Sequence, residues 1–316
     1  MRHIEIAVVG LGGVGGYFGF KLAHAFGRGG EAKVTFAARR ATYETVKERG
    51  LVLLSPEHEI QVARPDLLLS GVEELSKIDL VLICVKEYDL EQVCQQLKEK
   101  VTERAVILPL MNGVDIYDRI RKVITKGIVL PACVYVASHI KEKGIVEHKG
   151  KPGLIVFGKD PAFPQFYPEK VMELFQTAGI RYDYREDPFP DIWAKFVFIA
   201  SFGLVTARYN LPMGKVNEEE ELKEQAWSIM SEVVTVAGSK GVVLPDDIID
   251  RTFRKASSFP YHTPTSLQLD IHSGRPGNEL ELFAGAILGY GEEVKVPTPE
   301  TRRIYEEIKK LELRAK

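Results

Sequence analysis

The sequence has few cysteines and no pattern that would use them together. It contains three, Cys84, Cys94 and Cys133. Their number is odd and their spacing fits no Cys-x-x-Cys pattern, which argues against a disulfide framework and against a zinc cluster. We therefore expect no metal site, and a reducing cytoplasm is the simplest location.

The chain also lacks an excess of charge of either sign and a long apolar run. Its formal net charge is −2, so no overall field favours nucleic acid. No continuous run approaches the ~18 apolar residues that span a membrane. The N-terminal MRHIEIAVVG is too short and too early for a signal peptide. We expect neither a nucleic-acid nor a membrane partner.

The first half of the chain alternates between strand-like and helical patterns. Strand-like runs are IEIAVVG, KVTFAA, DLVLICV, AVILPL and IVLPACVYVAS. In YDLEQVCQQLKEK, a helical stripe joins Leu90, Val93, Cys94 and Leu97. This alternation predicts an α/β fold with a Rossmann-like, doubly wound parallel sheet. The stretches LVLLSPEHEIQV and GIVEHKGKPGLIVFG look like antiparallel additions to it.

After about Asp187 the strand signals stop and helical periodicity takes over. One long stripe contains Leu222, Ala226, Ile229, Met230, Val233, Val234 and Ala237. With 316 residues and 45% hydrophobic content, the chain is long enough for two domains. We predict an NADP-binding Rossmann-like domain over 1–186 and an all-α substrate and catalytic domain over 187–316. A ligand cleft between them is the default expectation.

A glycine-rich loop follows the first predicted strand. Gly10, Gly12 and Gly15 form Gly-x-Gly-x-x-Gly between a strand and a helix, the setting in which this pattern binds a dinucleotide. The glycines permit a tight turn, a close approach of the pyrophosphate and close helix–strand packing. The alternative is a glycine-rich turn without a ligand. The predicted cofactor-binding loop is Gly10, Leu11, Gly12, Gly13, Val14 and Gly15.

Two arginines end the second predicted strand, where NAD-binding versions carry an acidic residue. They are Arg39 and Arg40, and no acidic residue lies between Glu31 and Glu44. A guanidinium group can bind a 2′-phosphate with two hydrogen bonds, which predicts NADPH as the cofactor. One of the two arginines could simply be solvated. Arg39 is favoured because it comes first after the strand.

Polar residues follow two further strands. Lys86 comes after DLVLICV and Asn112 after AVILPL. Ligands of open α/β sheets bind at the carboxyl ends of the strands. Either residue alone could be an ordinary turn residue, but together with the glycine loop they predict one edge of a cofactor site.

At this point the sequence resembles the ketopantoate reductase (2-dehydropantoate 2-reductase) family. The matching stretches GLGGVGG, VTFAAR, ICVKEYD, PLMNGVD, WAKF, LVTA, TSLQLDI and GRPGNELELFAG follow the family's order over nearly the whole chain. The resemblance implies a Rossmann-like and a helical domain and NADPH as the cofactor. It also implies reduction of 2-dehydropantoate to pantoate for pantothenate and coenzyme A synthesis.

The resemblance also implies roles for single residues. Lys195 matches the catalytic lysine, which would protonate the oxygen of the reduced carbonyl group. Glu279 matches the substrate-binding glutamate, Ser266 the serine that binds the substrate carboxylate, and Asn112 the asparagine that positions nicotinamide and substrate. Thr206 matches the family's Thr-Ala and is predicted to be a further substrate-binding residue.

Each of these residues also has a structural interpretation. Lys195 could be a helical lysine whose ammonium group reaches solvent. Glu279 and Ser266 could lie in the first turn or cap of a helix. The glutamate match requires a one-residue insertion in SGRPGN, with Asn278 as its only rival. Lys86 would face the nicotinamide ribose or the substrate.

The sequence departs from the family at two positions. Ile199 and Gly203 lie four and eight residues after Lys195, on the same helical face, where the family commonly has asparagines. Losing two amides removes hydrogen-bond partners for substrate hydroxyls. A reductase of another 2-oxo acid is therefore the first alternative, and a non-catalytic NADP(H) sensor is the second. The sequence leaves the oligomeric state open, with a homodimer as the candidate assembly.

Overall fold

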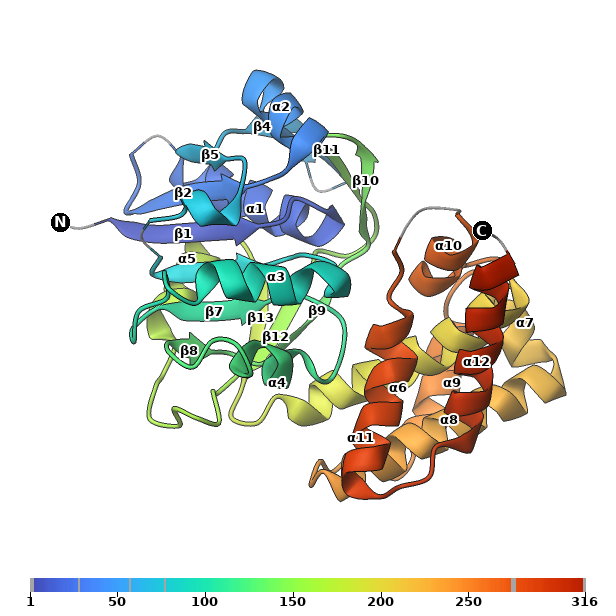
Figure 1. Ribbon diagram of the computed structural model, residues 1–316. Helices are drawn as coiled ribbons and strands as arrows, with labels where there is room; N and C mark the ends of the chain where they lie inside the picture. The colour runs from blue at the N-terminus through green and yellow to red at the C-terminus, as the bar shows by residue number, and fades with distance from the viewer. Residues whose placement is uncertain (1–2, 28, 57, 77, 274–276, 315–316) are drawn as a thin grey trace. The chain divides into compact units, whose positions relative to one another are not determined.

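The computed structural model describes residues 3–27, 29–56, 58–76, 78–273 and 277–314. The chain divides into two compact units. The first comprises 1–112 and 116–188, and the second comprises 113–115 and 189–316. Figure 1 shows strands and helices in the first unit and helices in the second.

The first unit is built on a six-stranded parallel sheet (Figure 1). Its strands, in the order β5-β2-β1-β6-β7-β8, are Leu67–Leu69, Ala32–Ala37, Ile4–Val9, Leu80–Ile83, Val106–Pro109 and Ile128–Val129. Each pair of neighbours is parallel. The chain moves outward from β1 first through β2 and β5, then through β6, β7 and β8. This reversal at β1 confirms the predicted doubly wound, Rossmann-like sheet.

The sheet is buried because its strands are continuous apolar runs. Every residue of Leu80–Ile83 and Val106–Pro109 is buried, as expected for strands covered on both faces. The associated helices are α1 (Gly13–Phe26), α2 (Arg40–Arg49), η1 (Val72–Glu74), α3 (Glu87–Leu97) and α4 (Ile116–Arg121). The predicted stripe of α3 is confirmed, since its buried residues are Leu90, Val93, Cys94 and Leu97.

Two smaller sheets complete this unit. One has the order β10-β11-β3-β4, with strands Ser138–Glu142, Ile145–His148, Leu51–Ser55 and His58–Ala63. The other has the order β13-β12-β9, with strands Arg181–Arg185, Leu154–Gly158 and Ala132–Tyr135. The helix α5 (Glu169–Thr177) lies between β12 and β13 in the chain.

The prediction that these additions are antiparallel is only partly correct. The pairs β3–β4, β10–β11 and β9–β12 are antiparallel, whereas β3–β11 and β12–β13 are parallel. A two-residue hairpin can join only antiparallel strands, but a long crossover allows parallel pairing. The helix α5 supplies such a crossover between β12 and β13. The predicted strand 128–138 is also divided, because Pro131 separates β8 from β9 and lacks the N–H that a ladder needs.

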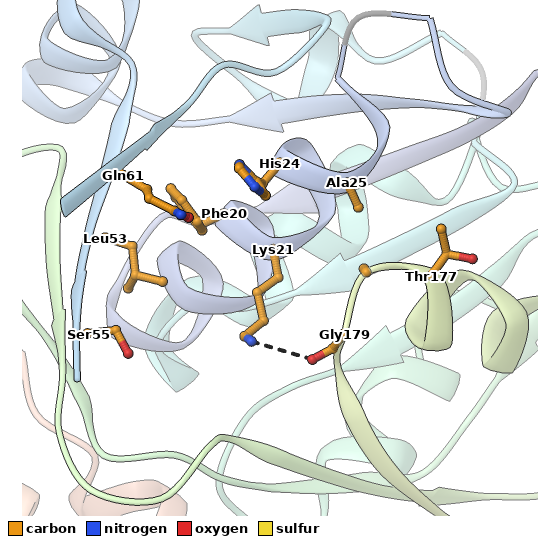
Figure 2. Close-up of a pocket in the computed structure, with 10 residues that line it drawn as sticks. Phe20, Lys21, His24, Ala25, Leu53, Ser55, Gln61, Thr177 and Gly179 are labelled. Carbon is orange, nitrogen blue, oxygen red and sulfur yellow. Dashed lines mark hydrogen bonds between the residues drawn. The ribbon is translucent and has the colours of Figure 1, made fainter. Parts of the chain in front are cut away.

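The helix α1 packs between the six-stranded and the four-stranded sheet. A hollow of about 430 Å³ lies beside its C-terminal half, against β3, β4 and the end of α5 (Figure 2). There the Lys21 ammonium group donates to the carbonyl oxygen of Gly179 over 3.4 Å. No residue that the sequence predicts for cofactor or substrate lines this hollow.

The second unit contains helices and, among its described residues, no strand. Its elements are α6 (Phe189–Tyr209), α7 (Met213–Glu218), α8 (Glu220–Ser239), α9 (Ile248–Ser257), α10 (Ser266–His272), the π-helix η2 (Glu281–Gly285), α11 (Ala286–Val294) and α12 (Pro299–Arg314). The helix α6 is the central element, in contact with α7, α8, α9, α10, η2 and α12. The all-α prediction is confirmed. The stripe of α8 is right except at Val234, which is half-buried, while Val236 is buried.

Helix α6 is long and apolar enough to cross a membrane by length and composition alone. Its most apolar window has a mean hydropathy of 1.3, and 67% of that window is buried within the protein. Burial to this extent is typical of the core helix of a globular unit. Three polar residues, Lys195, Ser201 and Thr206, are buried along it.

The three cysteines are buried, and none forms a disulfide. Burial raises the pKa of the Cys94 thiol to about 12 and also raises the pKa of the Cys84 thiol. A raised pKa keeps a thiol protonated and inert. All three cysteines belong to the buried core.

Candidate active site

The glycine loop has two positions that only glycine can occupy. Gly10 has φ +90°, and a Cβ there would lie 2.8 Å from the carbonyl oxygen of Cys84. A Cβ at Gly15 would lie 1.9 Å from the carbonyl oxygen of Gly10. The first glycine therefore makes the turn out of β1, and the second lets α1 pack against that turn.

Gly12 lies in a different environment. A Cβ built there meets no atom within 4 Å, and Gly12 is the N-cap of α1. The backbone N–H groups of the first turn of a helix have no partner within the helix, and they attract anions. The loop thus has open space at the residue through which a pyrophosphate would approach.

Gly13 and Gly16 serve packing against the β10–β11 hairpin. A Cβ at Gly13 would lie 2.4 Å from the carbonyl oxygen of Ser138, and a Cβ at Gly16 would lie 2.3 Å from a methyl carbon of Val146. Sequence reasoning did not find this contact. Leu11 is buried and Val14 is half-buried.

The two arginines lie where β2 passes into α2. Arg39 is the N-cap of α2, and Arg40 is exposed with φ +52°. The Arg39 guanidinium group forms an ion pair with Asp89 of α3, with 2.5 Å between Nη2 and Oδ2. Sequence reasoning missed Asp89, because it examined acidic residues near β2 only, and Asp89 follows another strand.

Lys86 and Asn112 follow neighbouring strands of the sheet. Lys86 is the N-cap of α3, just after β6, and Asn112 follows β7. Both are half-buried. Since β2, β1, β6 and β7 are consecutive parallel strands, the structure brings Arg39, the glycine loop, Lys86 and Asn112 to one edge of the sheet.

The helical unit buries two charged residues on elements that pack together. Lys195 of α6 is 8% exposed, and Glu279, just before η2, is 5% exposed. Among the described residues of this unit, no other charged side chain is buried. Aromatic contacts join the two elements, with 6.2 Å between the ring centroids of Phe196 and Phe283. Charged side chains are almost never fully buried unless they are paired. The burial of both a lysine and a glutamate on adjoining elements therefore marks these two residues as functional candidates.

Asn278, the rival of Glu279, is engaged elsewhere. Its side-chain oxygen accepts a hydrogen bond from the N–H of Leu280 over 2.9 Å, and its amide donates to Glu312. It caps the helix that Glu279 precedes. The π-helix η2 begins three residues after Asn278, at Glu281, and π-helical turns are frequent at functional sites. Half of the segment SGRPGN, with the inferred insertion, lies outside the described residues, namely 274–276.

Thr206 is tied to the helix that carries Ser266. Thr206 Oγ1 donates to the carbonyl oxygen of Phe202 over 2.7 Å and lies 2.7 Å from Oγ1 of Thr265. Thr265 is the N-cap of α10 and accepts a hydrogen bond from the N–H of Gln268. Ser266, the first residue of α10, is exposed. The Thr206 hydroxyl therefore holds the start of α10 in place.

The two family asparagine positions have different environments. Ile199 is half-buried and Gly203 is buried. A Cβ at Gly203 would meet only Leu267 of α10, at 3.8 Å. This is ordinary van der Waals distance, so packing against α10 does not require glycine at this position.

No group of three metal-binding side chains occurs among the described residues. The candidate residues lie in two places: a sheet edge with open space at the N-terminus of α1 in one unit, and a buried lysine and glutamate in the other. Comparison with known proteins decides the family. The family model described as "Ketopantoate reductase PanE/ApbA" matches residues 6–162. The model of its C-terminal domain matches residues 189–312. The chain belongs to the ketopantoate reductase family.

Curated relatives match this chain over nearly its whole length. An uncharacterized oxidoreductase, YkpB of Bacillus subtilis, is 27% identical over 302 residues, which cover 96% of this chain and 97% of that protein. A 2-dehydropantoate 2-reductase of Nostoc sp. is 24% identical over 321 residues, covering 99% and 96%.

Solved structures share the fold. A PanE/ApbA family ketopantoate reductase from Ralstonia eutropha has a TM-score of 0.87 at 27% identity and covers 99% of each chain. A D-mandelate dehydrogenase solved with NADH and anilino(oxo)acetate has a TM-score of 0.86 at 19% identity, again covering 99% of each chain. The likeness to the dehydrogenase concerns the fold alone.

Membership in this family makes the protein an oxidoreductase acting on a CH–OH group, with a nicotinamide dinucleotide as cofactor. The residues present fit such a cofactor. Gly12 leaves open space at the N-terminus of α1, and Arg39 presents a cation at the same sheet edge.

The variants Gly12→Ala and Gly15→Ala test cofactor binding and folding stability separately. Gly15→Ala lowers the free energy of unfolding by about 1–3 kcal/mol, because its Cβ meets backbone. Gly12→Ala leaves stability within about 0.5 kcal/mol but weakens dinucleotide binding. Thermal unfolding and cofactor titration measure the two effects. Unchanged cofactor affinity in Gly12→Ala would contradict this interpretation of the loop.

Thr206→Val removes the hydroxyl that holds α10 and keeps the side-chain shape. We expect a loss of about 1–2 kcal/mol in the free energy of unfolding, since the Thr265 hydroxyl loses a buried partner. The KM for the 2-oxo acid rises while cofactor affinity stays constant. Thr206→Ser restores both quantities. A KM that does not change in Thr206→Val would show that α10 does not depend on this bond.

Proposed function

We propose that the protein reduces 2-dehydropantoate to pantoate with NADPH, the step that serves pantothenate and coenzyme A biosynthesis. The observation that carries this proposal is the burial of Lys195 and Glu279 on adjoining elements of the helical unit. A fold that only bound a dinucleotide would have no use for a buried lysine and glutamate outside the nucleotide-binding unit. The family membership supplies the reaction class.

The N-terminal unit would hold the cofactor. The loop Gly10–Gly15 takes the pyrophosphate, and Arg39 binds the 2′-phosphate, with Arg40 as its neighbour. Lys86 and Asn112 face the nicotinamide end, where Asn112 also positions the substrate. The bound cofactor supplies a hydride to the ketone carbon of the substrate.

The helical unit would supply the acid and the substrate contacts. Negative charge develops on the carbonyl oxygen during reduction, and protonated Lys195 donates a proton to it. Glu279 accepts a hydrogen bond from a substrate hydroxyl and orients Lys195. Ser266 binds the substrate carboxylate. We assign Thr206 a positioning role, because its hydroxyl is bonded to Phe202 and Thr265.

A second candidate is reduction of another 2-oxo acid by the same machinery. Ile199 and Gly203 favour it, because neither can offer the amide that the family commonly has. A D-mandelate dehydrogenase shares this fold. The sensor alternative is weaker, since it gives the buried Lys195 and Glu279 no role. A cytoplasmic location and a homodimer stay predictions.

The deciding experiment follows NADPH oxidation with 2-dehydropantoate and with a panel of 2-oxo acids. We expect the highest kcat/KM for 2-dehydropantoate. A preference of more than about tenfold for another acid, or about 1.4 kcal/mol in the transition state, replaces the first candidate by the second. NADPH binding without oxidation by any acid supports the sensor.

Lys195→Ala should lower kcat by ~10²-fold or more, because a positioned acid contributes that much. Lys215→Ala is the control, since Lys215 also lies in the helical unit but pairs with Glu219 at 2.6 Å on the surface. Its kcat should stay normal. Turnover near that of the wild type in Lys195→Ala would remove this lysine from the mechanism.

Arg39→Ala should raise the KM for NADPH much more than the KM for NADH, because only NADPH has the 2′-phosphate. Arg49→Ala, at the other end of α2, removes an exposed arginine from the same helix and serves as the control. Steady-state kinetics with both cofactors measure the effect. Equal increases for the two cofactors would refute the 2′-phosphate role.

A further inference from the structure

The carboxylate of Asp89 contacts the guanidinium group on which the proposed NADPH preference depends. Arg39 Nη2 and Asp89 Oδ2 are 2.5 Å apart, a short, charge-assisted hydrogen bond. The Arg39 side chain is 59% exposed and that of Asp89 is 21% exposed. The pair is therefore accessible to a ligand.

The two residues come from opposite sides of β1. Arg39 follows β2, and Asp89 lies in the first turn of α3, which follows β6. The strands β2 and β6 are the two that pair with β1. The ion pair thus lies at the carboxyl edge of the sheet, where β1 passes into the glycine loop. A Rossmann-like fold binds the adenosine ribose of its cofactor beside this loop.

A 2′-phosphate and the Asp89 carboxylate would compete for one guanidinium group. Bidentate binding of a phosphate uses two N–H donors of an arginine. In Arg39, the Nη2 group already donates a hydrogen bond to Asp89. An exposed ion pair is weak, so the phosphate can displace the carboxylate. The displaced carboxylate remains nearby, where its charge repels the phosphate.

With NADH the same carboxylate has the opposite effect. The ribose 2′-hydroxyl of NADH is a hydrogen-bond donor, and NAD-binding folds meet it with an Asp or Glu at the end of the second strand. Here that place holds Arg39 and Arg40, and the acidic residue comes from α3 instead. The site therefore has a cation for the 2′-phosphate and an anion for the 2′-hydroxyl.

We propose that Asp89 is a cofactor-specificity residue. Its carboxylate competes with the 2′-phosphate for Arg39 and accepts a hydrogen bond from the 2′-hydroxyl of NADH. It thereby lowers the ratio of the affinity for NADPH to the affinity for NADH. The proposal rests on the cofactor role proposed for Arg39. Glu87, in the same turn of α3, does not share this function, because its carboxylate pairs with Arg119 of α4.

The test is equilibrium titration of the full-length protein with NADPH and with NADH, followed by nicotinamide fluorescence. Asp89→Asn should lower the Kd for NADPH about twofold to fivefold and raise the Kd for NADH about threefold. Glu87→Gln removes the same charge from the same helical turn. It should change the ratio of the two Kd values by less than about twofold. Thermal unfolding checks that each variant is folded.

A double-mutant cycle isolates the pair. In the Arg39→Ala background, Asp89→Asn should give a smaller gain in NADPH affinity, because there is no guanidinium group to release. An unchanged ratio of Kd values in folded Asp89→Asn overturns the proposal. Weaker NADPH binding in Asp89→Asn also overturns it, since Asp89 would then hold Arg39 in place for the phosphate.

The titration also separates this inference from the proposed function. If the wild-type protein binds neither dinucleotide, the proposed function and this inference both fail. If it binds both and Asp89→Asn leaves their ratio unchanged, only the inference fails. Failure to reduce 2-dehydropantoate would overturn the substrate assignment and leave the binding result standing.

Discussion

The close contact between α1 and the backbone around it is the constraint on which the N-terminal unit depends. At Gly15 the helix touches the turn that leaves β1, and at Gly13 it touches the backbone of β10. Neither contact leaves space for a side chain. Because α1 is held between two sheets in this way, its N-terminus has a fixed place at the sheet edge, where Gly12 leaves room for a phosphate.

The helical unit depends on a different feature, a long apolar helix with buried polar groups. Helix α6 contacts most of the other helices of its unit, so residues along it have fixed positions relative to those helices. Lys195 is buried on it, and Thr206 connects it to α10. The same helix thus presents the proposed acid and orients the segment that carries Ser266.

The sequence predicted those features that depend on local pattern. The doubly wound sheet, the buried stripe of α3 and the helical second half follow from periodicity over adjacent residues. Features that depend on distant residues were missed. Asp89 meets Arg39 only because β2 and β6 flank β1, and the parallel pairing of β3 with β11 requires a contact between remote segments. Pro131 is a local signal for the break between β8 and β9. The continuous apolar run around it nevertheless led to the prediction of one strand where the chain passes from one sheet to another.

The roles of the candidate residues likewise divide into those that the sequence indicated and those that required the structure. Glycine spacing indicated a phosphate loop and the place of Gly12 in it, but it gave no sign that Gly13 and Gly16 pack against the hairpin. The family resemblance indicated Thr206, whereas only the structure relates its hydroxyl to Thr265. Asn278 and Glu279 are adjacent in the sequence, and only the structure distinguishes their roles. Glu279 is buried, whereas the Asn278 side chain forms hydrogen bonds with Leu280 and Glu312.

The contact of Gly13 and Gly16 with the hairpin has an evolutionary consequence. A mutation that adds a side chain at either glycine requires a compensating change near Ser138 or Val146. The phosphate loop and the hairpin therefore cannot diverge independently. Selection that maintains the loop also maintains the shape of a surface segment that need not touch any ligand.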